Sequence, residues 1–276
     1  MKKIPHEYVF LIPLVVFMGL FVLYPLSCVI AQSFTDNRTG SLTFQNYVNI
    51  FTQGRFLLPL KNTIWFAGAC TIVGALGGTF VGLLVSRMSA SLRNLVLSLY
   101  SIPMTLSSLV VAFGFIVLLG RNGVFNVLLN RYLGLPKFNL YSWHGLLVTY
   151  SFYNIPLMTL TMAAVFLNLD RSLVEAARNL GANGWQVWMY IIIPVLAPGF
   201  LTGVSIVLTG MLAAFGTALA LTGMAMRLFA LQIYSLASES EFDLPQASAL
   251  AIVLVITIVF TLFVLNWIER RLKPAE

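Results

Sequence analysis

Long apolar stretches, separated by short polar segments, make up most of the chain. Six of these stretches contain no Asp, Glu or Lys in their interior. A bilayer core of about 30 Å needs about 20 apolar residues in a helix, so each stretch is long enough to cross it. The pattern predicts an all-α membrane protein with six transmembrane helices. The predicted spans are residues 9–31, 62–86, 95–119, 144–167, 197–222 and 247–268.

The composition agrees with this fold class. Of the 276 residues, 59% are hydrophobic and 9% are charged, and the mean hydropathy is +0.91. A soluble domain carries about 25% charged residues. Because so few polar side chains cannot cover a water-soluble surface, we expect one transmembrane domain over residues 1–276 in a lipid bilayer. The net charge of +7 comes from basic residues scattered over many loops, which is typical of membrane ends and argues against nucleic-acid binding.

The N-terminal apolar run, residues 8–31, is a candidate signal peptide. It is longer than the apolar core of such a peptide, about 7–15 residues, and no A-x-A cleavage site follows it. We therefore expect a retained span. Cys28 and Cys70 both lie inside apolar runs, so we expect them to pack there and not to form a disulfide or bind a metal. The two histidines, His6 and His144, are far apart in the sequence, and we expect no metal site from them.

The distribution of basic residues predicts the orientation. With six spans, both termini lie on the same side of the membrane. If that side is the cytoplasm, nine Lys and Arg residues fall in the inner loops and seven in the outer loops. The positive-inside rule favours this arrangement, and it places residues 168–196, between the fourth and fifth spans, in the cytoplasm.

Glycines recur at a spacing of four in the second predicted span, at Gly74, Gly78 and Gly82. Residues four apart share one helix face, and small residues there let a second backbone approach closely. We expect these glycines to pack against another helix; general glycine enrichment in membrane helices is the alternative.

The first outer loop contains an amphipathic pattern. Phe44, Tyr47, Val48 and Phe51 recur at the i, i+3, i+4, i+7 spacing of a helix with one apolar face. The pattern predicts a helix that lies on the outer membrane surface.

Several signatures of catalysis are missing from the sequence. There is no phosphate-binding G-x-x-x-x-G-K-[ST], no H-E-x-x-H, no C-x-x-C and no G-x-S-x-G. A membrane enzyme is therefore disfavoured. Ion-coupled carriers usually place an ionisable side chain inside the membrane, and the predicted spans have none, which disfavours a secondary carrier. If the chain moves a substrate, we expect the energy to come from another protein.

The segment 168–196 reads as two short helices. Ser172 and Glu175 fit the S-x-x-E capping box at the start of the first. Gly181 is placed to end it in the left-handed conformation, and Asn183 is placed to cap the second. An amphipathic connector lying on lipid is one interpretation. The adjacent alanines at 176–177, flanked by polar residues, favour instead a helix that docks in a partner's groove.

These residues carry a family resemblance. E-A-A-R-N-L-G, nine residues and then I-I-I-P closely resembles the E-A-A motif of membrane permease subunits of bacterial binding-protein-dependent ABC importers, with Ile193 where Leu is usual. The resemblance implies a coupling helix that docks on an ATPase, supported by Ser172, Ile191 and Pro194. The docking residues would be Glu175, Ala176, Ala177, Arg178, Asn179, Leu180 and Gly181.

The resemblance also implies the other subunits of the transporter. A cytoplasmic ABC ATPase dimer would bind ATP and Mg, so that this chain binds no cofactor and is not itself an enzyme. A second permease subunit, identical or homologous, would complete the path. An extracytoplasmic solute-binding protein would deliver the substrate. The chain would be a multi-pass protein of the bacterial inner membrane with both termini in the cytoplasm.

The substrate path has weaker signals. Ala214–Gly223, A-F-G-T-A-L-A-L-T-G, looks like a region of permeases for iron, polyamines, thiamine and phosphonates. Asn154 lies two residues before Pro156, whose ring disturbs helical hydrogen bonding. The alternative is that such polar side chains form hydrogen bonds with the backbone of their own helix and do not line a path. The candidates for the path or gate are Asn154, Phe215, Gly216 and Thr217.

An acidic cluster, Glu239, Glu241 and Asp243, lies in the last outer loop. It is placed to attract a cationic substrate or to pair with basic residues of the binding protein. A solvated loop with no such role is the alternative.

Overall fold

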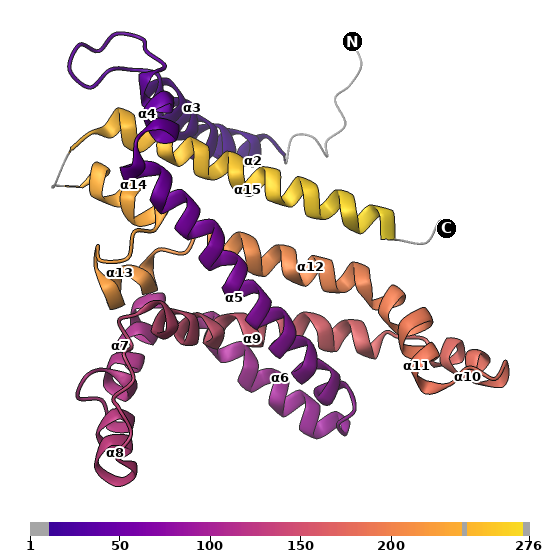
Figure 1. The fold of residues 1–276 in the computed structure, drawn as a ribbon. Helices are drawn as coiled ribbons and strands as arrows, with labels where there is room; N and C mark the ends of the chain where they lie inside the picture. Colours follow the sequence, from indigo (N-terminus) through magenta and orange to yellow (C-terminus); the bar gives the residue numbers. More distant parts are fainter. Residues whose placement is uncertain (1–10, 239–241, 273–276) are drawn as a thin grey trace, which may run out of the picture. The chain divides into compact units, whose positions relative to one another are not determined.

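The computed structural model describes residues 11–238 and 242–272, and the regular elements there are helices (Figure 1). A single isolated bridge joins Thr35 and Leu42 within these ranges. The chain forms two compact units. Unit 1 comprises residues 1–60 and 228–256, and unit 2 comprises residues 61–227 and 257–276.

Unit 1 begins with one continuous helical segment. It consists of α2 (Leu11–Met18), a π-helical turn η1 (Gly19–Leu23) and α3 (Tyr24–Ser33). The unit also contains α4 (Gln45–Thr52), α14 (Phe229–Ala237), the start of α5 (Gly54–Ser86) and the first part of α15 (Leu244–Leu272). Its apolar core is formed by Ile50, Phe56, Phe229, Leu236, Ala247, Ala249, Leu250 and Val253.

The predicted amphipathic helix in the first outer loop is α4. Its buried face contains Asn46 and Ile50, while Phe44, Val48 and Phe51 are exposed. The Asn46 amide group donates to the carbonyl of Ser33 at 3.0 Å and to that of Thr35 at 2.8 Å. A polar residue thus fixes the helix to the end of α3, which the apolar spacing alone does not reveal.

Unit 2 is organised around α9 (Trp143–Leu167), which packs against α6 (Ala90–Thr105) and α12 (Ile193–Leu212). One end of the α9–α12 pair carries α10 (Arg171–Asn179), α11 (Gly184–Val187) and a π-helical turn η2 (Trp188–Ile192). The other end carries α7 (Ser108–Leu119), α8 (Val124–Leu133) and α13 (Gly216–Thr222), as Figure 1 shows. The predicted docking segment, now α10, and the predicted path residues 215–217 at the start of α13 therefore lie toward opposite ends of the α9–α12 pair.

The glycines of α5 face α9. A Cβ atom at Gly74 would lie 2.7 Å from the Cβ of Asn154, and one at Gly82 would lie 3.0 Å from the Cβ of Met162. At Gly78 it would lie 2.8 Å from the carbonyl oxygen of Ile155. The backbones approach so closely that no side chain fits between them.

The same closeness joins α12 to α9. A Cβ atom at Gly203 would lie 2.6 Å from the sulfur of Met158. A Cβ at Gly199 would overlap the side chain of Val165. Because packed interiors transmit displacement rather than absorb it, α9 and α12 are suited to move as one body.

The described residues contain six helical segments that are long and apolar enough to span a membrane, which confirms the predicted number. They are Pro13–Ser33, Gly54–Ser86, Ser108–Leu133, Trp143–Leu167, Gly184–Leu212 and Leu244–Leu272.

Two predicted spans are interrupted. The stretch 95–119 divides into α6 and α7, because Leu106 and Ser107 are extended with ψ of 139° and 140°. The stretch 197–222 divides into α12 and α13, with residues 213–215 outside both helices. Apolar composition indicates that a segment lies in the membrane, but it does not reveal where the backbone breaks between two apolar helices.

Candidate functional site

The E-A-A segment forms α10, an exposed helix with no buried residue. Glu175, Ala176 and Asn179 are exposed and Ala177 is half-buried. Leu180, an apolar side chain just after the helix, is 89% exposed. Such a helix offers small, polar and apolar groups together to a partner surface.

The N-terminal cap of α10 differs from the prediction. The capping box at Ser172 is wrong, because the cap is Asp170, whose side chain accepts a hydrogen bond from the Ser172 amide at 2.9 Å. The helix begins at Arg171, which places Ser172 inside the first turn. The hydrogen bond from the Ser172 backbone is the main cause that lowers the pKa of the Asp170 carboxyl. Both residue types cap well, and the sequence alone did not decide between them.

The C-terminal end of α10 agrees with the sequence. Gly181 has a φ of 84°. Its amide donates to the carbonyl of Arg178 at 2.9 Å, and the Ala182 amide donates to that of Ala177 at 3.0 Å. These two bonds form a Schellman motif, which needs a left-handed residue at this position.

The second short helix is also capped as predicted. The Asn183 side chain accepts from the Gln186 amide at 2.9 Å, and the Gln186 side chain accepts from the Asn183 amide at 2.8 Å. The segment is thus fixed at both turns. Beyond it, half-buried Ile191 lies in η2 and exposed Pro194 lies at the start of α12.

A cavity of about 310 Å³ lies on the inner side of α10. Val174 and Arg178 line it from α10, with Leu83 and Arg87 from the end of α5 and its following turn. Arg178 therefore faces the bundle, whereas Glu175 and Leu180 do not line this cavity.

A second cavity, of about 380 Å³, lies between α9, α12 and α13. The four predicted path residues all line it: Asn154 from α9, and Phe215, Gly216 and Thr217 from the start of α13. We call it the central cavity. Its lining is Ser108, Tyr150, Tyr153, Asn154, Leu157, Ile206, Val207, Gly210, Met211, Ala213, Ala214, Phe215, Gly216 and Thr217.

Hydrogen bonds tie the walls of the central cavity together. The Thr217 hydroxyl donates to the Ser108 carbonyl at 3.4 Å, which joins α13 to α7. The Ala218 amide donates to the Tyr150 hydroxyl at 3.2 Å, which joins α13 to α9. Sequence reasoning did not single out Tyr150; its i, i+4 relation to Asn154 on one helix face was the available signal.

A comparison with known families decides the identity. Residues 74–275 match the model of the family described as "Binding-protein-dependent transport system inner membrane component". The chain belongs to this family. It is a multi-pass inner-membrane permease subunit of an ABC importer, and the secondary-carrier alternative is set aside.

Curated relatives of the permease cover most of its length. It is 30% identical over 256 residues to the spermidine/putrescine transport system permease protein PotB of Haemophilus influenzae, covering 88% of this chain and 87% of that protein. It is 27% identical over 259 residues to the sulfate transport system permease protein CysT of Escherichia coli K12, covering 92% and 89%.

Solved structures share the fold of the permease. A chain of a bacterial ABC transporter involved in the import of the acidic polysaccharide alginate superposes with a TM-score of 0.80 at 20% identity, covering 96% of this chain and 95% of that chain. A second structure, of a bacterial alginate ABC transporter in complex with an alginate pentasaccharide-bound periplasmic protein, superposes with a TM-score of 0.79 at 20% identity and covers 98% of this chain and 95% of that chain.

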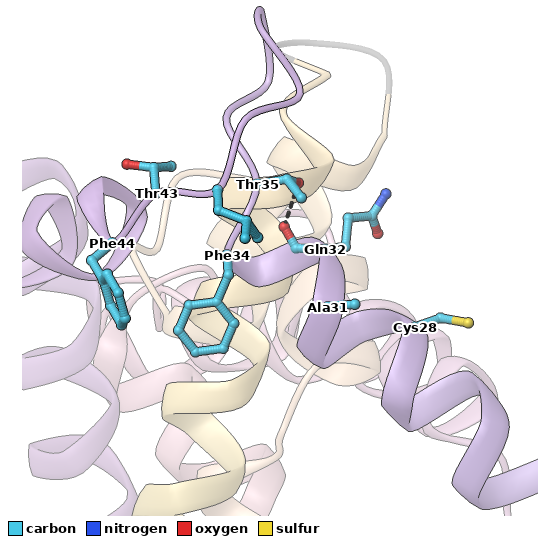
Figure 2. A pocket seen from close by; sticks show the side chains of 8 residues that line it. Cys28, Ala31, Gln32, Phe34, Thr35, Thr43 and Phe44 are labelled. Atoms are coloured by element: carbon cyan, nitrogen blue, oxygen red, sulfur yellow. Dashed lines mark hydrogen bonds between the residues drawn. The ribbon is translucent and has the colours of Figure 1, made fainter.

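Unit 1 of the permease contains a further cavity, of about 920 Å³, at the end of α3 (Figure 2). Phe34 and Phe44 line it and meet edge to face with ring centroids 5.3 Å apart. Gln32 and Thr35 also line it, and the Thr35 hydroxyl donates to the Gln32 carbonyl at 2.8 Å, as Figure 2 shows. These polar groups are paired locally.

The acidic cluster of the permease is only partly described. Glu239 and Glu241 lie outside the described residues. Asp243 accepts a hydrogen bond from the Gln246 amide at 3.1 Å and so caps α15. A structural role thus accounts for the one described member of the cluster.

Proposed function

We propose that α10 is the coupling helix of this permease and that it docks on a cytoplasmic ABC ATPase. The observation that carries the proposal is the exposure of Glu175, Ala176 and Leu180 on a segment fixed by Asp170 and by the Schellman motif at Gly181. A rigid, solvent-facing helix meets the partner already ordered, which keeps the entropy cost of docking low.

In this proposal the ATPase dimer binds ATP and Mg and carries out hydrolysis. This chain supplies no nucleotide site and binds no cofactor. A second permease subunit, identical or homologous, completes the path, and an extracytoplasmic binding protein delivers the substrate. The end of α9 and α12 that carries α10 faces the cytoplasm, together with both termini.

The central cavity forms part of the translocation path. Its walls come from α9 and α12, which also hold α10 at their other end. Close contacts at Gly199 and Gly203 join these two helices. A displacement of α10 by the ATPase is therefore carried along the pair to Asn154 and to the Phe215–Thr217 segment.

A cysteine at Leu180 tests both the docking and the orientation. In a Cys28→Ala, Cys70→Ala background, Leu180→Cys is expected to react with a membrane-impermeant maleimide in inside-out vesicles. Bound ATPase should slow this labelling about tenfold or more, because a docked side chain loses its access to solvent. Tyr132→Cys in α8, where Tyr132 is 74% exposed, is the matched control: it should react from the outer side in right-side-out vesicles, and bound ATPase should not change that rate.

Either of two results would overturn the proposal. One is labelling of Leu180→Cys from the outer side in right-side-out vesicles. The other is equal labelling with and without ATPase, in vesicles where the ATPase is shown to be bound.

A further inference from the structure

The break between α6 and α7 places a helix start at the central cavity. Leu106 and Ser107 are extended, and the first backbone bond of α7 runs from the Val111 amide to the Ser107 carbonyl at 3.1 Å. The Ser107 side chain makes no capping bond. The amides of the first turn, residues 108–110, therefore have no partner inside the helix, and the helix dipole adds partial positive charge there.

Two contacts hold this helix start against the cavity wall. The Thr217 hydroxyl donates to the Ser108 carbonyl at 3.4 Å. A Cβ at Gly216 would overlap the Ser108 hydroxyl, so the two chains touch at this glycine. Ser108 itself lines the cavity.

Hydrogen-bond donors face the same space from α9. Asn154 lines the cavity and is only 2% exposed, and its amide nitrogen has no hydrogen-bond partner among the described residues. The buried hydroxyl of Tyr153 likewise has none within the described ranges. The Tyr150 hydroxyl accepts from the Ala218 amide, which leaves its own proton to donate. Buried polar groups are rarely left unpaired, so these donors point to a ligand.

The absence of charged side chains among the described residues that line the cavity limits the kinds of ligand that it can bind. Among the described residues that line the cavity there is no Asp, Glu, Lys, Arg or His. A metal cation or a polyamine would need carboxylate partners in such an apolar setting. Uncharged donors together with a helix N-terminus instead suit a group that only accepts hydrogen bonds and carries negative charge.

We propose that the central cavity is a transit site for a small inorganic oxyanion. The first turn of α7, the Asn154 amide and the hydroxyls of Tyr150 and Tyr153 donate to its oxygens. The volume of about 380 Å³ leaves room for the anion and several waters. Donors without a fixed positive charge bind the anion weakly enough for it to leave, as conduction requires. The inference rests on the proposed role of this cavity in the path.

Uptake by the complete transporter tests the inference. Labelled sulfate, molybdate and phosphate are compared with labelled putrescine and maltose in cells that contain the permease with its own ATPase and binding protein. At least one oxyanion should be taken up. At limiting concentration, Asn154→Leu should lower its uptake about 10- to 100-fold, the value of one hydrogen bond to a charged group. Asn154→Asp, which adds a negative charge, should lower it further.

Two further variants keep the test interpretable. Tyr153→Phe removes one hydroxyl and keeps the ring, and it should lower uptake about tenfold. Thr161→Val in the same helix is the control, because the Thr161 hydroxyl donates to the Leu157 carbonyl at 3.0 Å and lines no part of the cavity. It should leave uptake unchanged.

Retention of the ATPase on α10 is measured for every variant and separates the two proposals. Loss of ATPase binding in the unaltered transporter would contradict the coupling proposal and not this one. With ATPase retained, the oxyanion site is contradicted if only putrescine or maltose enters. It is equally contradicted if Asn154→Asp and Tyr153→Phe both take up the oxyanion within twofold of the unaltered transporter.

Discussion

Glu175→Lys is expected to lower substrate uptake about 100-fold or more while the permease still folds and inserts. Glu175 is exposed in the fifth position of α10, so the substitution disturbs no buried contact of its own chain. Surface charge changes on a helix alter its stability by only about 0.2–0.5 kcal/mol. In a docked interface, a charge that loses its partner costs about 2–5 kcal/mol, and about 2.7 kcal/mol corresponds to 100-fold.

The measurement compares initial uptake rates at equal amounts of permease in the membrane. Glu175→Gln, which keeps the shape and removes the charge, should give an intermediate rate. Arg131→Glu in α8 reverses a charge at another exposed helical position and should leave uptake within about twofold, as expected for a solvated surface charge. Normal uptake by Glu175→Lys would contradict the assignment of α10 as the coupling element.

Gly216→Val is expected to lower uptake by up to about 100-fold, for a different reason. A Cβ at this position would overlap the Ser108 hydroxyl, so a branched side chain must push α13 away from α7. Overpacking of this kind costs about 1–3 kcal/mol. If the conformation with an open path bears the upper end of this cost, uptake falls about 100-fold. The ATPase should still bind, because α10 lies at the other end of the α9–α12 pair.

Gly210→Ala is the matched control for this prediction. Gly210 lines the same cavity, but a Cβ there would meet nothing within 4 Å. Uptake by Gly210→Ala should stay within about twofold, since a single methyl in open space adds no strain. Equal losses of uptake in Gly216→Val and Gly210→Ala would contradict a role in transport for the contact between α7 and α13.

The parts of the site that were predictable are those fixed by local backbone chemistry. Gly181 ends α10 in the left-handed conformation, and Asn183 caps the next helix, because each of these roles suits few residue types. The start of α10 was mispredicted because Asp170 and Ser172 are both good caps, and only the course of the chain chooses between them.

The break at residues 106–107 shows a second limit of the sequence. Both flanking segments are apolar, so their pattern reads as one continuous span. Asn154 was expected near the path from its position beside Pro156, but its meeting with Phe215 and Thr217 of the α13 segment depends on tertiary packing. The Asn46 anchor of α4 is likewise a contact distant in sequence. Local rules therefore predicted the docking segment better than the cavity.

The most direct test of the account measures whether α10 controls the central cavity. Gly210→Cys, in the Cys28→Ala, Cys70→Ala background, places a thiol in the open part of that cavity. Its alkylation rate is measured in the assembled transporter with and without ATP. We predict that ATP changes this rate several-fold, and that Glu175→Lys abolishes the change. An identical response to ATP with Glu175 and with Lys at this position would contradict the coupling of α10 to the cavity.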